Sequence, residues 1–418
     1  MSKAKQMAKL VGVIDGGREE VINLQRSLVA IPALAPESEG DGEKAKADFM
    51  RSWLEKAEFD ELIELNAPDP RVPCGYRPNM LCRLFGEERS RTVWVLAHLD
   101  VVPAGDLKKW KSKPFELKLE GDELFGRGTE DNHQGLISGL LAVKAFKTAG
   151  IQPPCNLGLA LVADEETSSR YGLDYLMTHH ADQFGADDLV LVPDAGDEAG
   201  TLIEIAEKSI LWLKVTVVGK QCHGSTPELG NNAARAAAHL VVRMDGLEGI
   251  FDARNPLFEP PISTFEPTKH EANVPNVNTV PGKEVFYFDC RVLPEYPLEE
   301  VEKKIRGMVK EVRDRFGVKI RLEFAQRAEA APPTPESAPV VVALKRAIRE
   351  IKGVEPRCVG IGGGTVAAIF RRAGIPAAVW SSLMDTAHQP NESSRISDTL
   401  GDARVMAHVM LHALEAGK

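Results

Sequence analysis

An apolar run, Val93-Trp94-Val95-Leu96-Ala97, ends abruptly at His98-Leu99-Asp100. A run of this length, rich in β-branched and aromatic residues, is typical of a strand buried in a sheet. Ligands of open α/β sheets bind beyond the carboxyl ends of the strands, so His98 is a candidate site residue. Asp100 can reach back to the second ring nitrogen of His98, an arrangement that orients a metal-binding imidazole. A histidine at a strand end is more often a packing or surface residue. The assignment of His98 as a ligand therefore depends on whether other strand ends carry matching ligands.

Two further apolar runs end in carboxylates. Residues 156–163 lead into Asp164-Glu165-Glu166, and residues 188–193 lead into Asp194. Strand and helix patterns alternate from about Asn79 to Asp194, which predicts a mostly parallel sheet covered by helices. Carboxylates and an imidazole at one edge of such a sheet form a site suited to a hard or borderline dication.

The adjacent pair Glu165-Glu166 is informative because neighbours on a regular strand point to opposite faces. Both can face one site only if the strand has already turned. Two solvated glutamates in a loop are the ordinary alternative. At a strand end, however, one carboxylate can bind a metal while the other receives a proton from the attacking water.

Composition limits the classes of partner. The chain has 418 residues, 43% of them hydrophobic, and a formal net charge of −10, which argues against nucleic-acid or anionic-membrane partners. No stretch approaches the length of a membrane span, and residues 1–18 are too polar for a signal-peptide core. We therefore expect a cytoplasmic protein. The six cysteines contain no CxxC pair and are expected to be reduced.

The pattern changes after Thr201. Strands and helices follow in the order β-α-β-β-α-β up to Phe324, which is a compact α+β unit in its own right. We predict a catalytic α/β domain formed by residues 1–206 and 325–418, interrupted by a lid and dimerisation domain at residues 207–324. The long strand predicted over Ile210 to Val218 is expected at the edge of the lid, where its backbone could pair between subunits.

These motifs together resemble those of a known family. His98-x-Asp100, Gly126-Arg127-Gly128 followed by Asp131, Glu165-Glu166, Asp194 and a distant His388 occur in the order found in the di-zinc amidohydrolases and exopeptidases. This family includes carboxypeptidase G, acetylornithine deacetylase, succinyl-diaminopimelate desuccinylase, aminoacylase and several dipeptidases. The resemblance covers nearly the whole chain, and the spacings between His98, Asp131 and Glu165 are each one strand-helix crossover long.

The resemblance implies a role for each matching residue. Asp131 would bridge two zinc ions, for which Co²⁺ or Mn²⁺ would substitute. His98 and Asp194 would complete one site, and Glu166 and His388 the other. Glu165 would be the general base for a water bridging the two ions, and Asp100 the partner of His98. In the inserted domain, His223 of Cys222-His223-Gly224-Ser225 would stabilise the oxyanion in a neighbouring subunit's site, which implies a homodimer. Substrate contacts would come from the following residues: Asn278, Arg291, Gly364 and Thr365.

The sequence departs from the family around Asp131. Asn132-His133-Gln134 replaces a run that more commonly contains a lysine, and relatives often hold the peptide bond after the bridging aspartate in the cis form. We expect His133 to line the site and not to bind metal.

The implied reaction is hydrolysis of the amide bond of an N-acyl amino acid or a short peptide that carries a free carboxylate, as in a deacetylase or desuccinylase. A dipeptidase or carboxypeptidase of the same family is the alternative, and a non-catalytic metal-binding assembly protein is the alternative from another class. A dinucleotide-binding loop at Gly360-x-Gly362 is disfavoured, because Thr365 stands where the motif needs glycine.

Overall fold

In the computed structural model, which describes residues 1–415, the chain forms two units. Unit 1 contains residues 1–205, 333–359 and those from Thr365 onwards, and unit 2 contains residues 206–332 and 360–364. The domain boundaries drawn from the sequence, at residues 206/207 and 324/325, stay a prediction. None of the helices within residues 1–415 is long and apolar enough to cross a membrane.

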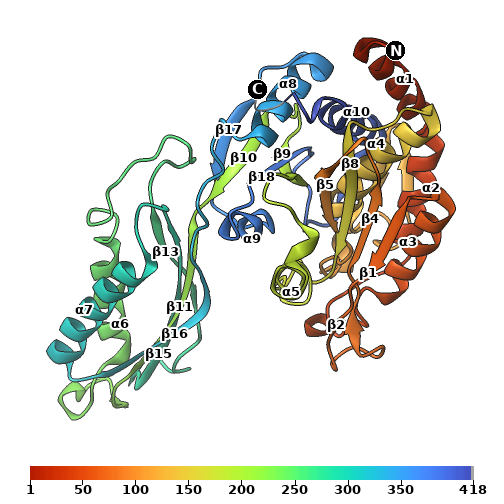
Figure 1. Ribbon diagram of the computed structural model, residues 1–418. Helices are drawn as coiled ribbons and strands as arrows, with labels where there is room; N and C mark the ends of the chain where they lie inside the picture. The colour runs from red at the N-terminus through yellow and green to blue at the C-terminus, as the bar shows by residue number, and fades with distance from the viewer. Residues whose placement is uncertain (416–418) are drawn as a thin grey trace. The chain divides into compact units, whose positions relative to one another are not determined.

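Unit 1 is built on an eight-stranded sheet (Figure 1). Its strands, in spatial order, are β1 (Glu61–Glu64), β4 (Met80–Leu84), β8 (Cys155–Val162), β5 (Glu88–His98), β9 (Leu189–Asp197), β18 (Ala377–Ser382), β10 (Leu202–Glu207) and β17 (Arg357–Ile361). The four central strands β8, β5, β9 and β18 run parallel. The predicted α/β class, with its mostly parallel central sheet and a lid, is therefore confirmed. The strands β1, β4 and β10 pair antiparallel, which the sequence did not reveal.

Helices cover both faces of this sheet (Figure 1). Their bounds are α1 (Lys3–Asp15), α2 (Arg18–Val29), α3 (Lys44–Ala57), α4 (Gly135–Ala149), α5 (Leu173–His179), α8 (Pro339–Lys352), α9 (Ala367–Arg372) and α10 (Ile396–His412). Trp94 and Leu96 of β5 pack in one core with α5 and α9. Val95 points the other way, against α4, because successive side chains of a strand alternate between faces.

Gly158 of β8 allows this strand to pair with β5 at the position of Trp94, the bulkiest side chain of β5. A Cβ on Gly158 would lie 2.3 Å from Cε3 of Trp94, so only glycine leaves room for the indole ring. The parallel strands then bring their carboxyl ends to one edge, with His98 opposite Val162. Asp194, expected just beyond its strand, lies inside β9, where the pairing with β18 becomes irregular.

Unit 2 contains a four-stranded antiparallel sheet with two helices on one face. The strand order is β13 (Thr264–His270), β15 (Lys283–Val292), β11 (Ser209–Val218) and β16 (Lys319–Ala328), and the helices are α6 (Ala233–Asp245) and α7 (Leu298–Phe316). Alternate residues of β11 and β15 form the core with the apolar faces of both helices. The expectation that Ile210 to Val218 lies at the edge is wrong, because β11 pairs along its whole length with both β15 and β16.

The remaining strands are short. They are β2 (Ala67–Pro68) with β3 (Tyr76–Arg77), β6 (Lys118–Glu120) with β7 (Glu123–Phe125) and β19 (Ser393–Arg395) in unit 1, and β12 (Cys222–His223) with β14 (Thr279–Val280) in unit 2. The pairing of β7 with β19 brings the segment before Asp131 next to the segment after His388.

Candidate dinuclear metal centre

Two groups of potential ligands at the carboxyl edge of the unit 1 sheet share Asp131. His98, Asp131 and Asp194 form the first group, and Asp131, Glu166 and His388 form the second, with the ligand atoms of each group within 4.8 Å of one another. Nε2 of His98 lies 2.8 Å from Oδ1 of Asp131, and Nε2 of His388 lies 3.0 Å from Oδ2. Because the two oxygens of Asp131 face different groups, this carboxylate is placed to bridge two cations.

Irregular backbone positions the shared aspartate. Asp131 and Asn132 have non-helical φ and ψ inside the turn that leads into α4, and the peptide bond between them is cis. The amide of Asn132 donates to Oδ1 of Asp194 (2.6 Å) and to the carbonyl of Pro193 (2.8 Å). Asn132 therefore orients Asp194, a role that sequence reasoning missed although the residue lies next to a predicted ligand.

Asp100 holds the two neighbouring glutamates in place. Its carboxylate accepts the backbone N–H of Glu165 and of Glu166, each at 3.0 Å. Nδ1 of His98 lies 3.0 Å from the carbonyl oxygen of Asp100 and 3.6 Å from its carboxylate. The imidazole is thus oriented by the backbone, while the buried carboxylate fixes the turn that lets both glutamates approach one site.

The electrostatics are those of several carboxylates crowded in a small space. Burial, with the charge of Asp194 next in size, raises the pKa of Glu165 well above its ordinary value. Hydrogen bonds to Asp131 and Glu166 raise the pKa of His388 to about 10. A divalent cation relieves such repulsion directly, because it supplies the positive charge that the carboxylates otherwise take from the imidazoles.

The donor atoms fit a pair of divalent metal ions. Each group offers an imidazole nitrogen and carboxylate oxygens, which are ligands for zinc and other borderline metals. Oε1 of Glu166 is buried and has no hydrogen-bond partner among residues 1–415, although buried carboxylate oxygens are normally engaged. A metal ion in the second group would supply that missing partner.

A buried network lies behind the site. Lys46 of α3 is 1% exposed, and its Nζ lies 2.9 Å from Nε2 of His133. Burial lowers the pKa of both side chains, that of Lys46 to about 7. His133 is thus a buried partner of Lys46, and the expectation that it lines the site stays a prediction. Arg77 pairs with Glu43 and lies 3.4 Å from Asp164, the residue before Glu165.

The predicted substrate residues fall into three places. In unit 2, His223 and Asn278 lie together, because β12 pairs with β14 and the N–H of Gly224 donates to the carbonyl of Asn278 (2.7 Å). Arg291 donates to Asp289 through two nitrogens (2.7 and 3.0 Å) and to the carbonyl of Gly362 (2.7 Å). Gly364 ends the glycine segment of unit 2, and Thr365 begins the next segment of unit 1, where its hydroxyl accepts the N–H of Ala367.

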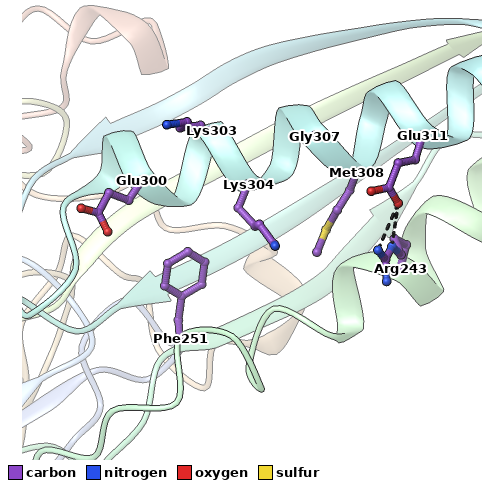
Figure 2. Close-up of a pocket in the computed structure, with 8 residues that line it drawn as sticks. All are labelled: Arg243, Phe251, Glu300, Lys303, Lys304, Gly307, Met308 and Glu311. Atoms are coloured by element: carbon purple, nitrogen blue, oxygen red, sulfur yellow. Dashed lines mark hydrogen bonds and ion pairs between the residues drawn. The ribbon is translucent and has the colours of Figure 1, made fainter.

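A hollow of about 500 Å³ on unit 2 is lined by α7, Arg243 and Phe251 (Figure 2). Figure 2 draws one polar contact there, the ion pair between Arg243 and Glu311. Nε and Nη2 of Arg243 each lie 3.1 Å from Oε2 of Glu311. Within residues 1–415, the two groups around Asp131 are the sets of three or more ligand atoms close enough to hold a metal. The candidate metal site therefore lies in unit 1.

A sheet edge with two ligand groups that share one carboxylate is a candidate dinuclear metal site of the kind that metallohydrolases use. Consistent with this, residues 94–412 match the model of peptidase family M20/M25/M40, and the chain belongs to that family. It is 39% identical to an uncharacterized metallohydrolase of Methanocaldococcus jannaschii, over 94% of this chain and 99% of that one. A succinyl-diaminopimelate desuccinylase of Nitratiruptor sp. is 26% identical, over 89% and 94% of the two chains.

Solved structures agree on the fold. The di-peptidase Dug1p of Saccharomyces cerevisiae superposes over 100% of both chains with a TM-score of 0.77 at 19% identity. A dinuclear metal binding peptidase of Bacillus subtilis from the M20 family superposes over 96% of this chain and 99% of its own, with a TM-score of 0.68 at 13% identity.

Proposed function

We propose that the chain hydrolyses the amide bond of an N-acyl amino acid or short peptide with a free carboxylate, using two zinc ions. His98, Asp131 and Asp194 would hold one ion, and Asp131, Glu166 and His388 the other. The observation that carries the proposal is that Asp131 joins the two ligand groups through its separate oxygens. Co²⁺ and Mn²⁺ have related ligand preferences and would substitute.

Glu165 is the proposed general base. Within residues 1–415, no hydrogen bond or ion pair engages its carboxylate, whereas its backbone is fixed by Asp100. When bound, the metal ions would polarise the substrate carbonyl and lower the pKa of the attacking water. A carboxylate oxygen of Glu165 accepts the proton of the water as the water oxygen bonds to the carbonyl carbon, and it delivers that proton to the leaving nitrogen as the C–N bond breaks.

The contacts of His223 support its proposed role as an oxyanion donor. Nδ1 lies 3.1 Å from the backbone N–H of Ser225 and 2.7 Å from the hydroxyl oxygen of the same residue, so Nε2 is the nitrogen that we propose as the donor. The exposed imidazole thus presents a donor for the negative charge that develops on a carbonyl oxygen. In the family resemblance this histidine serves a neighbouring subunit, and we propose a cytoplasmic homodimer formed through the lid.

Arg291 is the proposed anchor for the substrate carboxylate. Three of its five N–H groups are used by Asp289 and Gly362, and within the part of the chain that the structure describes the other two are available to a planar anion. Asn278, Gly364 and Thr365 are proposed as further substrate contacts. The names of the relatives support two substrate classes, N-succinyl amino acids and dipeptides. A panel of N-acetyl, N-succinyl and N-formyl amino acids and dipeptides, assayed with zinc, cobalt and manganese, separates them.

The two neighbouring glutamates test the mechanism. Glu165→Ala should retain two metal ions and lose turnover by a factor on the order of 10²–10⁴, the usual contribution of a positioned general base. Glu166→Ala should instead lose one ion, because His388 and Asp131 alone hold zinc poorly. Metal counting by mass spectrometry, with kinetics on both variants, measures the difference. If Glu165→Ala loses metal while Glu166→Ala keeps two ions, the roles are reversed.

A non-catalytic binding protein is the competing function. Wild-type protein that is purified without metal, and that stays inert on the whole panel after zinc is restored, would favour that alternative.

A further inference from the structure

The ligands of the second metal group come from loops far apart in the sequence. Asp131 lies in the segment between β7 and α4, and His388 lies in the segment of residues 383–392 between β18 and β19. The side chain of His388 is 57% exposed, whereas that of Asp131 is 18% exposed. The position of His388 therefore depends on how its loop is anchored, since few contacts surround the imidazole itself.

The loop that carries His388 has an unfavourable backbone. Asp385, His388 and Asn391 all have positive φ, between 61° and 65°, in a segment without regular secondary structure. Residues other than glycine adopt this left-handed region only when the surrounding structure compensates them. Gln389 supplies part of that compensation from inside the loop, through the carbonyl oxygens of Asp385 and Thr386, and contacts from outside the loop add to it.

Glu392 ties this loop to the loop of Asp131. Its fully buried carboxylate accepts the backbone N–H of Gly128 (2.9 Å), of Glu130 (3.0 Å) and of Asp131 itself (3.0 Å). Nη1 of Arg127 adds a fourth donor at 2.6 Å. One side chain from the histidine loop thus fixes the backbone of the proposed bridging ligand.

Glu130 makes the reciprocal connection. Its carboxylate, 2% exposed, accepts the backbone N–H of Met384 and of Thr386, the latter at 2.6 Å. The hydroxyl of Thr386 lies 2.7 Å from the same oxygen. A side chain next to Asp131 therefore fixes the backbone that leads into His388, two residues further on.

We propose that Glu130 and Glu392 are positioning residues that together set the spacing of Asp131 and His388, and so determine the affinity of the second metal site. This inference rests on the proposed function for the existence of that site. Neither carboxylate points to a ligand atom, and each acts through backbone N–H groups of the opposite loop. The first site should depend on them less, because His98 and Asp194 belong to strands of the central sheet.

The test uses the full chain and the substitutions Glu130→Gln and Glu392→Gln. Glutamine keeps the size but offers one acceptor oxygen, so its NH₂ group opposes a backbone N–H. Zinc or cobalt is titrated into metal-free protein against a chelator of known affinity, and the Co²⁺ absorption spectrum is recorded. We expect the second ion to bind about tenfold or more weakly, the effect of losing a charge-assisted hydrogen bond, with the first ion nearly unchanged.

Asp188→Asn is the matched control. Asp188 is a buried carboxylate that accepts the N–H groups of Thr92 (2.7 Å) and Gly185 (2.8 Å), and it precedes β9, at the amino end of that strand. It should lose stability in urea while the affinities for both ions stay the same. If a glutamine variant does not fold, Thr386→Val removes one contact of Glu130, and the second ion should then bind about threefold more weakly.

The outcomes separate the two proposals. Unchanged second-site affinity in the folded variants, or equal weakening of both sites, overturns the positioning role alone. A wild-type chain that binds fewer than two ions overturns both proposals. Normal binding of two ions without hydrolysis of any amide counts against the proposed function alone.

Discussion

Replacing Asp100 by asparagine tests how the site orients its general base. The carboxylate is 1% exposed and accepts two backbone N–H groups at 3.0 Å, from Glu165 and Glu166. Asparagine retains a single acceptor oxygen, so one hydrogen bond is lost and an NH₂ group faces a buried N–H. A hydrogen bond to a charged group contributes about 1.5–3 kcal/mol.

The lost hydrogen bond should lower kcat, because Glu165 and Glu166 are positioned through those N–H groups. At about 1.4 kcal/mol per tenfold change, kcat should fall roughly 10- to 100-fold, with a smaller change in KM. The ion held by His98 should be retained, since the imidazole takes its orientation from the carbonyl of Asp100, which the substitution preserves. Steady-state kinetics on the best substrate of the panel, metal counting and urea unfolding measure the three quantities.

Two results would refute this reasoning. A kcat within twofold of the wild type would show that Asp100 does not position the base. Loss of the ion at His98 would show instead that the carboxylate acts through the imidazole, across the 3.6 Å that separates them. Asp188→Asn is the control, because it removes a buried carboxylate of similar hydrogen-bonding capacity and should leave kcat unchanged.

Two further predictions concern stability. Burial, with the charge of Asp402 next, raises the pKa of Asp398 to about 6, so stability should fall as pH rises from about 4 to 6, where the unfolded state loses its proton first. Asp398→Asn should therefore stabilise the protein by up to about 3 kcal/mol at pH 8 and by about half as much at pH 5; equal effects in urea unfolding at both values would contradict this. Arg77→Met should destabilise by about 3–5 kcal/mol, because it leaves Glu43 and Asp164 as buried charges without their cation. Simultaneous Glu43→Gln should recover part of that loss, and a double variant less stable than Arg77→Met would argue against the pairing.

The sequence by itself determined the sheet and the residues that gather at its edge. Buried strands such as β5 and β8 can be predicted from the sequence because every residue near their centres is apolar. Parallel strands then bring their carboxyl ends to one edge of the sheet. His98, Glu166 and Asp194 were therefore candidates before any coordinates, whereas the resemblance to a family was needed to connect Asp131 and His388 with them.

Only the tertiary structure decided which elements and side chains are neighbours. β11 and an edge strand can share the same alternating pattern, and its central place depends on β15 and β16, which follow much later in the chain. The reciprocal hydrogen bonds of Glu130 and Glu392 join positions more than 250 residues apart. They are made to backbone N–H groups, which every residue except proline possesses. Hydrophobic periodicity records burial along one element, but it carries no information on which distant backbone a buried carboxylate will meet.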